Sequence, residues 1–205
     1  MDDAPVMHVT DLVCGYAGRD LFAPVSFRLT AGQALRIAGA NGQGKTTLLR
    51  AIAGLTQPLA GRVAWHGHAE FAASVGLIAH ENGLNAALTP GENLDLLLHL
   101  SGCRTDAAQV GEALTQLGLR NLQRRLCGRL SAGQRRRVAL ARLWLEHKQV
   151  WLLDEPAAAL DVDARALLCR RIAALVRQGG MVIFSTHEEL SLPDVSPQVV
   201  QLQPC

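Results

Sequence analysis

The stretch GANGQGKT, residues 39–46, has the residue types and the spacing that bind phosphate groups. Gly39, Gly42 and Gly44 let the main chain curl tightly, so that successive N–H groups can point at phosphate oxygens. The Lys45 ammonium can reach the terminal phosphates of a nucleotide, and the Thr46 hydroxyl can bind Mg²⁺. The stretch lies between an expected strand and an expected helix, whose positive N-terminus favours anions. It therefore predicts a nucleoside triphosphate site that uses Mg²⁺.

A second group of side chains that could do chemistry follows two apolar stretches. Asp154 and Glu155 end the apolar run of VWLLDEP, and His187 ends FSTH. A strand that is apolar at every position is buried on both faces, as in a parallel sheet, and open α/β sheets bind ligands at the carboxyl ends of their strands. At such a place Asp154 can hold Mg²⁺, and Glu155 can orient or deprotonate an attacking water. We expect His187 at the same edge of the sheet.

The stretch LSAGQRRR, residues 130–137, predicts the start of a helix. Ser131 and Gln134 have the spacing of a capping box. Capping does not explain Gly133, because glycine costs ~1 kcal/mol relative to alanine in a helix. A glycine here permits close approach of another group to the first N–H donors. These donors and the Ser131 hydroxyl predict a second anion site.

The arginines of the same stretch do not indicate nucleic-acid binding. Consecutive helical residues lie about 100° apart around the axis, so Arg135, Arg136 and Arg137 cannot form one flat patch. No aromatic residues alternate with them to stack on bases. The net charge of +2 is also too small to attract nucleic acid. We expect no nucleic-acid partner.

An α/β fold must position these side chains. Short stretches rich in Val, Leu and Ile alternate with longer segments of helical period, which is typical of a largely parallel sheet. Strands are expected at 33–39, 61–67, 74–79, 149–154 and 180–186. Helices replace the strand signal from residue 80 to residue 148. We predict one domain over residues 1–205, with a catalytic core formed by 1–79 and 149–205 and a helical subdomain formed by 80–148.

The composition is typical of a folded cytosolic protein. Apolar residues make up 49% of the 205 residues and charged residues 19%, which allows a sizeable core and argues against disorder. The five cysteines are scattered and predict reduced thiols. We expect no signal peptide, because the first residues are acidic and polar. The apolar runs fall short of the ~20 residues that span a membrane.

Taken in order, the phosphate-binding loop, LSAGQ, LLDEP and STH resemble the nucleotide-binding subunits of ABC (ATP-binding cassette) transporters. The resemblance covers nearly the whole chain. It implies a RecA-like P-loop NTPase core with a small antiparallel β subdomain and an inserted helical subdomain. It also implies an ATPase that uses ATP and Mg²⁺. Two subunits would form a homodimer head to tail, with each ATP held between one subunit's P-loop and the other's signature sequence.

The resemblance implies roles for individual residues. Asp161 matches the loop that crosses the dimer interface, and His187 matches the contact to the γ-phosphate. Tyr16 stands where the family stacks an aromatic ring on adenine, although a tyrosine packed at a strand end remains the alternative. The implied ATP-binding residues are Gly39, Ala40, Asn41, Gly42, Gln43, Gly44, Lys45, Thr46, Thr47 and Tyr16. The implied signature residues, which act on the partner's ATP, are Ser131, Ala132, Gly133 and Gln134.

Within that family the sequence is similar to the ATP-binding subunit of the haem exporter of cytochrome c maturation. Ala132 stands where the signature usually has a glycine, and ARLWL follows the arginines, as in that type. His80 stands where most ABC ATPases have a glutamine. The haem-exporter type also has a histidine there, usually followed by Gln, whereas Glu81 follows here. His80 is therefore a further candidate ligand of Mg²⁺.

This similarity implies an ATPase at the cytoplasmic face of a bacterial inner membrane, peripheral to it, that energises c-type cytochrome biogenesis. It would do so by haem export or by release of a haem carrier. The implied partners are the integral membrane subunits of the haem exporter, of the B type and also of the C and D types. An ABC ATPase for a lipid, drug or metal fits the motifs equally well. A non-transport ABC protein acting on DNA or ribosomes is disfavoured, because the insert between His80 and Ser131 leaves no room for a coiled coil.

Overall fold

The computed structural model describes residues 6–16, 19–66 and 74–205. The strands are β1 (Val6–Val13), β2 (Gly15–Tyr16), β3 (Arg19–Asp20), β4 (Val25–Thr30), β5 (Ala34–Ala38), β6 (Ala60–His66), β7 (Val75–Ile78), β8 (Val150–Asp154), β9 (Met181–Ser185) and β10 (Gln198–Gln201). The helices are α1 (Lys45–Ile52), α3 (Pro90–Leu100), α4 (Ala107–Gln116), α5 (Ala132–Glu146) and α6 (Val162–Arg177), with the short 3₁₀ helices η1 (Arg120–Leu122) and η2 (Cys127–Arg129).

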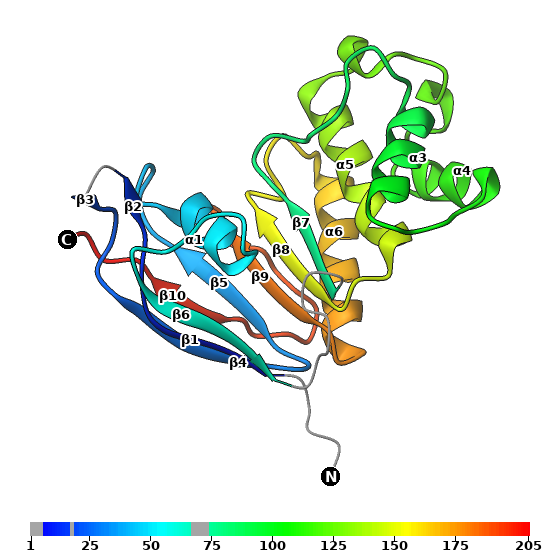
Figure 1. Cartoon of the computed structure of the whole chain (residues 1–205). Helices are drawn as coiled ribbons and strands as arrows, with labels where there is room; N and C mark the ends of the chain where they lie inside the picture. Colours follow the sequence, from blue (N-terminus) through cyan, green and yellow to red (C-terminus); the bar gives the residue numbers. More distant parts are fainter. Residues whose placement is uncertain (1–5, 17–18, 67–73) are drawn as a thin grey trace.

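A parallel sheet forms the centre of the molecule, with the strand order β10-β5-β9-β8-β7. Strands β8 and β9 are buried at every residue, as their unbroken apolar runs predict. Val150 and Leu152 of β8 pack in one core with α1, whereas Trp151 and Leu153 pack in a second core with α5 and α6. Helices therefore cover both faces of this sheet, and the predicted α/β fold is confirmed (Figure 1).

A smaller antiparallel sheet has the order β4-β1-β6. Val9 of β1 lies opposite Phe27 of β4 and Val63 of β6, so the three strands share one apolar face. That face joins the core cluster that contains Leu48 and Ile52 of α1, which also packs against the parallel sheet. The antiparallel β subdomain expected from the family resemblance is therefore present. Its strand β6 ends at His66.

The helices α3, α4 and α5 lie together between β7 and β8 in the sequence and at one end of the molecule (Figure 1). They share a separate apolar core, which includes Leu94, Leu114 and Val138. Each of the three helices begins with a capping box, in which the N-cap side chain and the residue three positions later bond each other's main chain. None of the helices that the structure describes is long and apolar enough to cross a membrane.

Candidate functional site

The loop between β5 and α1 is where the sequence predicts a phosphate-binding cradle. Gly42 and Gly44 have φ angles of 77° and 91°, in the left-handed region that favours glycine. A Cβ at Gly44 would also lie 2.7 Å from the Phe22 ring. The Lys45 ammonium donates hydrogen bonds to the carbonyls of Gly39 and Ala40, at 2.9 and 3.0 Å. The lysine therefore lies across the loop, where it can reach phosphate oxygens.

A buried carboxylate lies beside the start of α1. The Thr46 hydroxyl donates to Oδ2 of Asp154 at 2.6 Å, and the Ser185 hydroxyl donates to Oδ1 at 2.6 Å. Asp154 is only 2% exposed, so these two hydroxyls fix its orientation. A hydroxyl and a carboxylate are the oxygen ligands that Mg²⁺ prefers, and Mg²⁺ usually keeps waters and binds substrate phosphates as well. The pair therefore fits a nucleotide-bound Mg²⁺. No cluster of three or more metal-ligating side chains occurs in the described residues.

Glu155 directly follows Asp154 in the sequence. Its backbone has an unusual conformation for a residue other than glycine, with a φ angle of +48°. Its N–H donates to the Ser185 hydroxyl at 3.0 Å. Its Oε1 is buried, has no hydrogen-bond partner among the described residues, and lies 3.2 Å from Nε2 of His187. Nε2 of His187 in turn lies 3.5 Å from the Lys45 ammonium. A carboxylate held in this way can accept a proton from a water beside the phosphate cradle.

These side chains line one cavity of about 640 Å³. Its lining residues are Tyr16, Leu21, Asn41, Gly42, Gly44, Lys45, Thr46, Thr47, His80, Asp154, Glu155, Ala158 and His187. Tyr16 is 56% exposed, and its hydroxyl lies 3.5 Å from that of Thr47, so its ring is open to a flat ligand at the mouth of the cavity. The structure therefore brings together the phosphate loop, both carboxylates, and the candidates Tyr16, His80 and His187.

The signature residues lie apart from that cavity. Ser131 caps α5, and its hydroxyl accepts a hydrogen bond from the Gln134 N–H at 3.2 Å, while the Gln134 side chain accepts from the Ser131 N–H at 2.9 Å. A Cβ at Gly133 would lie 2.2 Å from the carbonyl oxygen of Ala159, which explains why this position has a glycine. Ser131 and Ala132 are exposed. The helix start is thus open to a ligand from outside this chain.

Comparison with known proteins decides the family. The sequence profile of the ABC transporter family matches residues 22–158. The chain belongs to the ABC transporter family.

The most similar relatives carry a narrower description. The chain is 44% identical over 191 residues to "Cytochrome c biogenesis ATP-binding export protein CcmA 1" of Salmonella paratyphi A, covering 90% of this chain and 91% of the relative. It is 43% identical over 195 residues to the CcmA protein of Escherichia coli O157:H7, covering 92% of each. A solved ABC transporter ATP-binding protein of Pyrococcus furiosus has 27% identity and a TM-score of 0.82, and the match covers 96% of this chain and 97% of that one.

Asp161 lies at the start of α6 and beside the signature helix α5. Its side chain caps α6 by accepting from the Ala164 N–H at 2.9 Å, and it lies 3.6 Å from the Arg137 guanidinium. Asp161 is more than half exposed, so it can also meet a second subunit. The three arginines after the signature have different surroundings. Arg137 pairs with Asp161, Arg135 donates a hydrogen bond to the Leu130 carbonyl, and Arg136 is buried in the interior.

Sequence reasoning missed two residues of this site. Ser185 binds both Asp154 and the Glu155 main chain, but a serine at a strand end carries no signal of its own. Arg136 is 3% exposed, and nothing in the run of three arginines by itself distinguishes this buried residue from its two neighbours. A signal existed, because Arg136 lies three and four residues before Ala139 and Leu140, on the buried face of α5.

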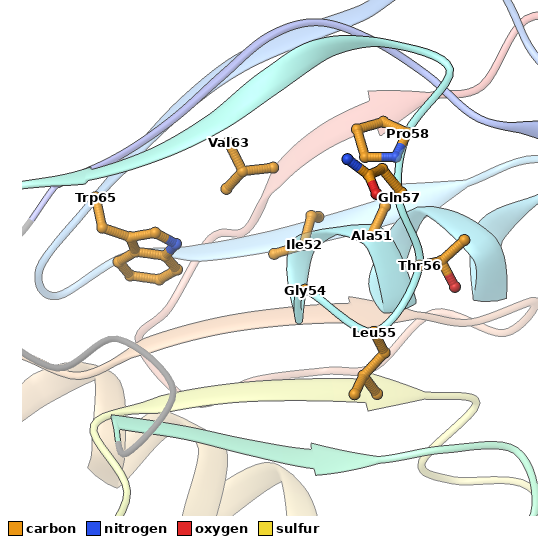
Figure 2. Close-up of a pocket in the computed structure, with 9 residues that line it drawn as sticks. All are labelled: Ala51, Ile52, Gly54, Leu55, Thr56, Gln57, Pro58, Val63 and Trp65. Carbon is orange, nitrogen blue, oxygen red and sulfur yellow. The ribbon is translucent and has the colours of Figure 1, made fainter.

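A second hollow, of about 540 Å³, lies at the far end of α1 (Figure 2). Figure 2 shows its walls on the end of α1, the segment after α1 and strand β6, with Trp65 at one side and Pro58 at the other. No titratable side chain lines it, and none of its residues lines the phosphate cavity. It therefore takes no part in the chemistry described above.

Proposed function

We propose that this chain is the ATP-hydrolysing, energy-coupling subunit of a bacterial ABC complex that acts in c-type cytochrome biogenesis. The observation that supports this most strongly is the 44% identity to proteins described as cytochrome c biogenesis export ATPases, extending over about nine tenths of both chains. The local geometry supports the chemistry, since the loop before α1, the carboxylates of Asp154 and Glu155 and the imidazole of His187 line one cavity. ATP bound there would be hydrolysed to ADP and phosphate to drive haem export or release of a haem carrier.

In the proposed mechanism, the loop amides and Lys45 bind the β- and γ-phosphates of ATP. Thr46 and Asp154 would hold Mg²⁺, which would supply positive charge beside the transferred phosphoryl group. Glu155 positions a water in line with the γ-phosphate and accepts its proton, because its carboxylate lines the phosphate cavity beside His187. His187 lies within reach of both Glu155 and Lys45 and contacts the γ-phosphate.

The site is completed by a second copy of the chain. The signature helix start is exposed in one subunit and lies outside that subunit's own phosphate cavity. In a head-to-tail homodimer, Ser131 and the N–H groups of α5 face the γ-phosphate held by the partner, where the positive helix end stabilises negative charge. His80 lines the cavity and is a further candidate ligand of Mg²⁺. Asp161 lies at the dimer interface.

Contact with the membrane is made by other chains in this proposal. We place this subunit at the cytoplasmic face of the inner membrane, bound to integral membrane subunits of the haem exporter's B type and to those of the C and D types. The support is the relatives' description as export ATP-binding proteins. The helices between β7 and β8 provide the surface for docking.

The test replaces Glu155 by Gln in the chromosome of the source bacterium and stains gels for covalent haem. A matched control is Glu112→Gln, because Glu112 is exposed on α4 and lies outside the cavity. Loss of c-type haem in Glu155→Gln alone, with b-type cytochromes retained, is the expected result. Normal c-type haem in a strain whose purified subunit hydrolyses ATP only with Glu155 intact would assign the ATPase to another transported substrate.

A further inference from the structure

Arg136 makes more polar contacts than any catalytic side chain described above. Its guanidinium donates hydrogen bonds to four main-chain carbonyls and one side-chain oxygen. The acceptors are the carbonyls of Ala79 at 2.7 Å, Glu155 at 2.9 Å, Pro156 at 3.4 Å and Asp154, and Oδ1 of Asn82 at 3.0 Å. Three of the carbonyls belong to the last residue of β8 and the two residues after it, and the other two acceptors belong to the loop that follows β7. One side chain thus joins two strand ends.

The contact to Glu155 matters because its backbone is strained. A φ of +48° is unfavourable for a residue with a Cβ and persists only where the surroundings hold it. The Glu155 N–H donates to Ser185, and its carbonyl accepts hydrogen bonds from Arg136 at 2.9 Å and from the Ala158 N–H at 3.0 Å. Arg136 is therefore the long-range one of two donors that hold this carbonyl, and the fixed main chain sets the direction in which the Glu155 side chain leaves it.

A general packing role does not explain an arginine here. Arg136 is 3% exposed, and none of the described carboxylates lies within ion-pair distance of its guanidinium. Burial lowers the pKa of Arg136 to about 10, although the charges of Asp154 and Glu155 act in the opposite direction. Burying such a charge is costly, and apolar replacements at buried charged positions are often as stable or more stable. The arginine is better explained by what it positions.

We infer that Arg136 is a positioning residue for hydrolysis, which ties loop 79–82 to the backbone of Glu155. The loop contributes His80 to the phosphate cavity, so a shift of the loop would move the acceptors Ala79 and Asn82 and would change how firmly Glu155 is held. This inference rests on the proposed role of Glu155 as the base. It adds a physical link between that base and the loop.

The test compares steady-state hydrolysis by the full-length chain and three variants: Arg136→Gln, Asn82→Ala and the double variant. Arg136→Gln should lower kcat about tenfold or more, since small misplacements of a catalytic group are costly in rate, while KM and the affinity for a fluorescent ATP analogue stay within about twofold. Asn82→Ala removes one of the two bonds from Arg136 to the loop and leaves the bond to the Ala79 carbonyl, so it should lower kcat less. In the Arg136→Gln background Asn82→Ala should have no further effect.

Rates are expressed per bound nucleotide, so that unfolded protein does not count. Arg142→Gln is the matched control, because Arg142 lies on the same helix, donates to the Leu77 carbonyl and pairs with Glu146, but makes no contact with the β8 end. It should lose thermal stability yet keep its kcat. If Arg136→Gln does not fold, Asn82→Ala still tests the link, because Asn82 is only half-buried.

Two results would overturn the inference. Arg136→Gln or Asn82→Ala could turn over at the parental rate while Glu155→Gln is inactive, in which case Glu155 acts as proposed and the link fails. Equal effects of Asn82→Ala in both backgrounds would also show that Arg136 does not transmit the loop's position. Parental turnover by Glu155→Gln would instead remove both the base and the role inferred for Arg136.

Discussion

The close approach of the signature helix to the loop before Asp161 gives a quantitative prediction for Gly133→Ala. The new Cβ would lie 2.2 Å from the Ala159 carbonyl oxygen, about 1 Å short of the ~3.3 Å at which carbon and oxygen make contact. The obstacle is main chain, so the loop or the helix must move. Overpacking of this kind costs about 1–3 kcal/mol.

Gly91→Ala is the matched control, because Gly91 is likewise the second residue of its helix and a Cβ there meets nothing within 4 Å. Both variants gain the same helix propensity, so their difference isolates the contact with Ala159. At about 2–4 °C per kcal/mol for a chain of this size, Gly133→Ala should melt roughly 2–12 °C below Gly91→Ala. Thermal unfolding followed by circular dichroism measures this.

The same variant should also lose hydrolysis, since displacement of Ala159 moves the loop that carries Asp161, the residue proposed to meet a second subunit. Nucleotide binding should persist, because the phosphate cradle does not contact Gly133. Equal melting temperatures for Gly133→Ala and Gly91→Ala would refute the reasoning, because the contact would then be relieved at no cost.

Two further predictions concern titratable groups. Burial raises the pKa of the thiols of Cys14, Cys127 and Cys169. At pH 8 the exposed Cys205 should therefore react first with a thiol reagent, and Cys205→Ser should remove that fast phase; fast reaction of a buried thiol would contradict this. Hydrogen bonds from the Thr89 N–H and hydroxyl lower the pKa of Glu92, so its stabilisation is present above its ordinary pKa and is lost as pH falls through the lowered value. The melting temperature of the parent should exceed that of Glu92→Gln at pH 7 and approach it at pH 3, whereas an equal gap at both pH values would be contrary evidence.

The sequence predicted those parts of the site that depend on local patterns. The phosphate loop, the buried strand before Asp154 and the capping box at Ser131 each lie within a few consecutive residues, and the structure has all three. The ends of the five strands predicted by residue range also agree closely with the observed ends, because apolar runs are bounded by polar or glycine residues. The strand β10 was not predicted, since its sequence QVVQ is short and half polar, and it forms only by pairing with β5.

The parts that escaped prediction depend on contacts between distant segments. Ser185 reaches Asp154 across neighbouring strands, and Arg136 reaches residues near 80 and 155. The carbonyl that requires a glycine at position 133 comes from Ala159, which no spacing rule connects to the signature. Sequence patterns located the reacting groups, whereas the groups that hold them in place became visible only in three dimensions.

The most direct test of an ATP site formed by two copies of the chain is the molar mass of Glu155→Gln in the presence of MgATP. Size-exclusion chromatography with light scattering measures it. A stable dimer is expected, because ATP is bound but not hydrolysed. Adding Ser131→Arg should return the protein to a monomer that still binds ATP. Ser131 does not line the chain's own phosphate cavity, so its replacement should leave ATP binding intact. Loss of the dimer would then come from loss of the contact with the second copy. A Glu155→Gln protein that hydrolyses ATP at the parental rate, or a dimer that survives Ser131→Arg, would contradict the account.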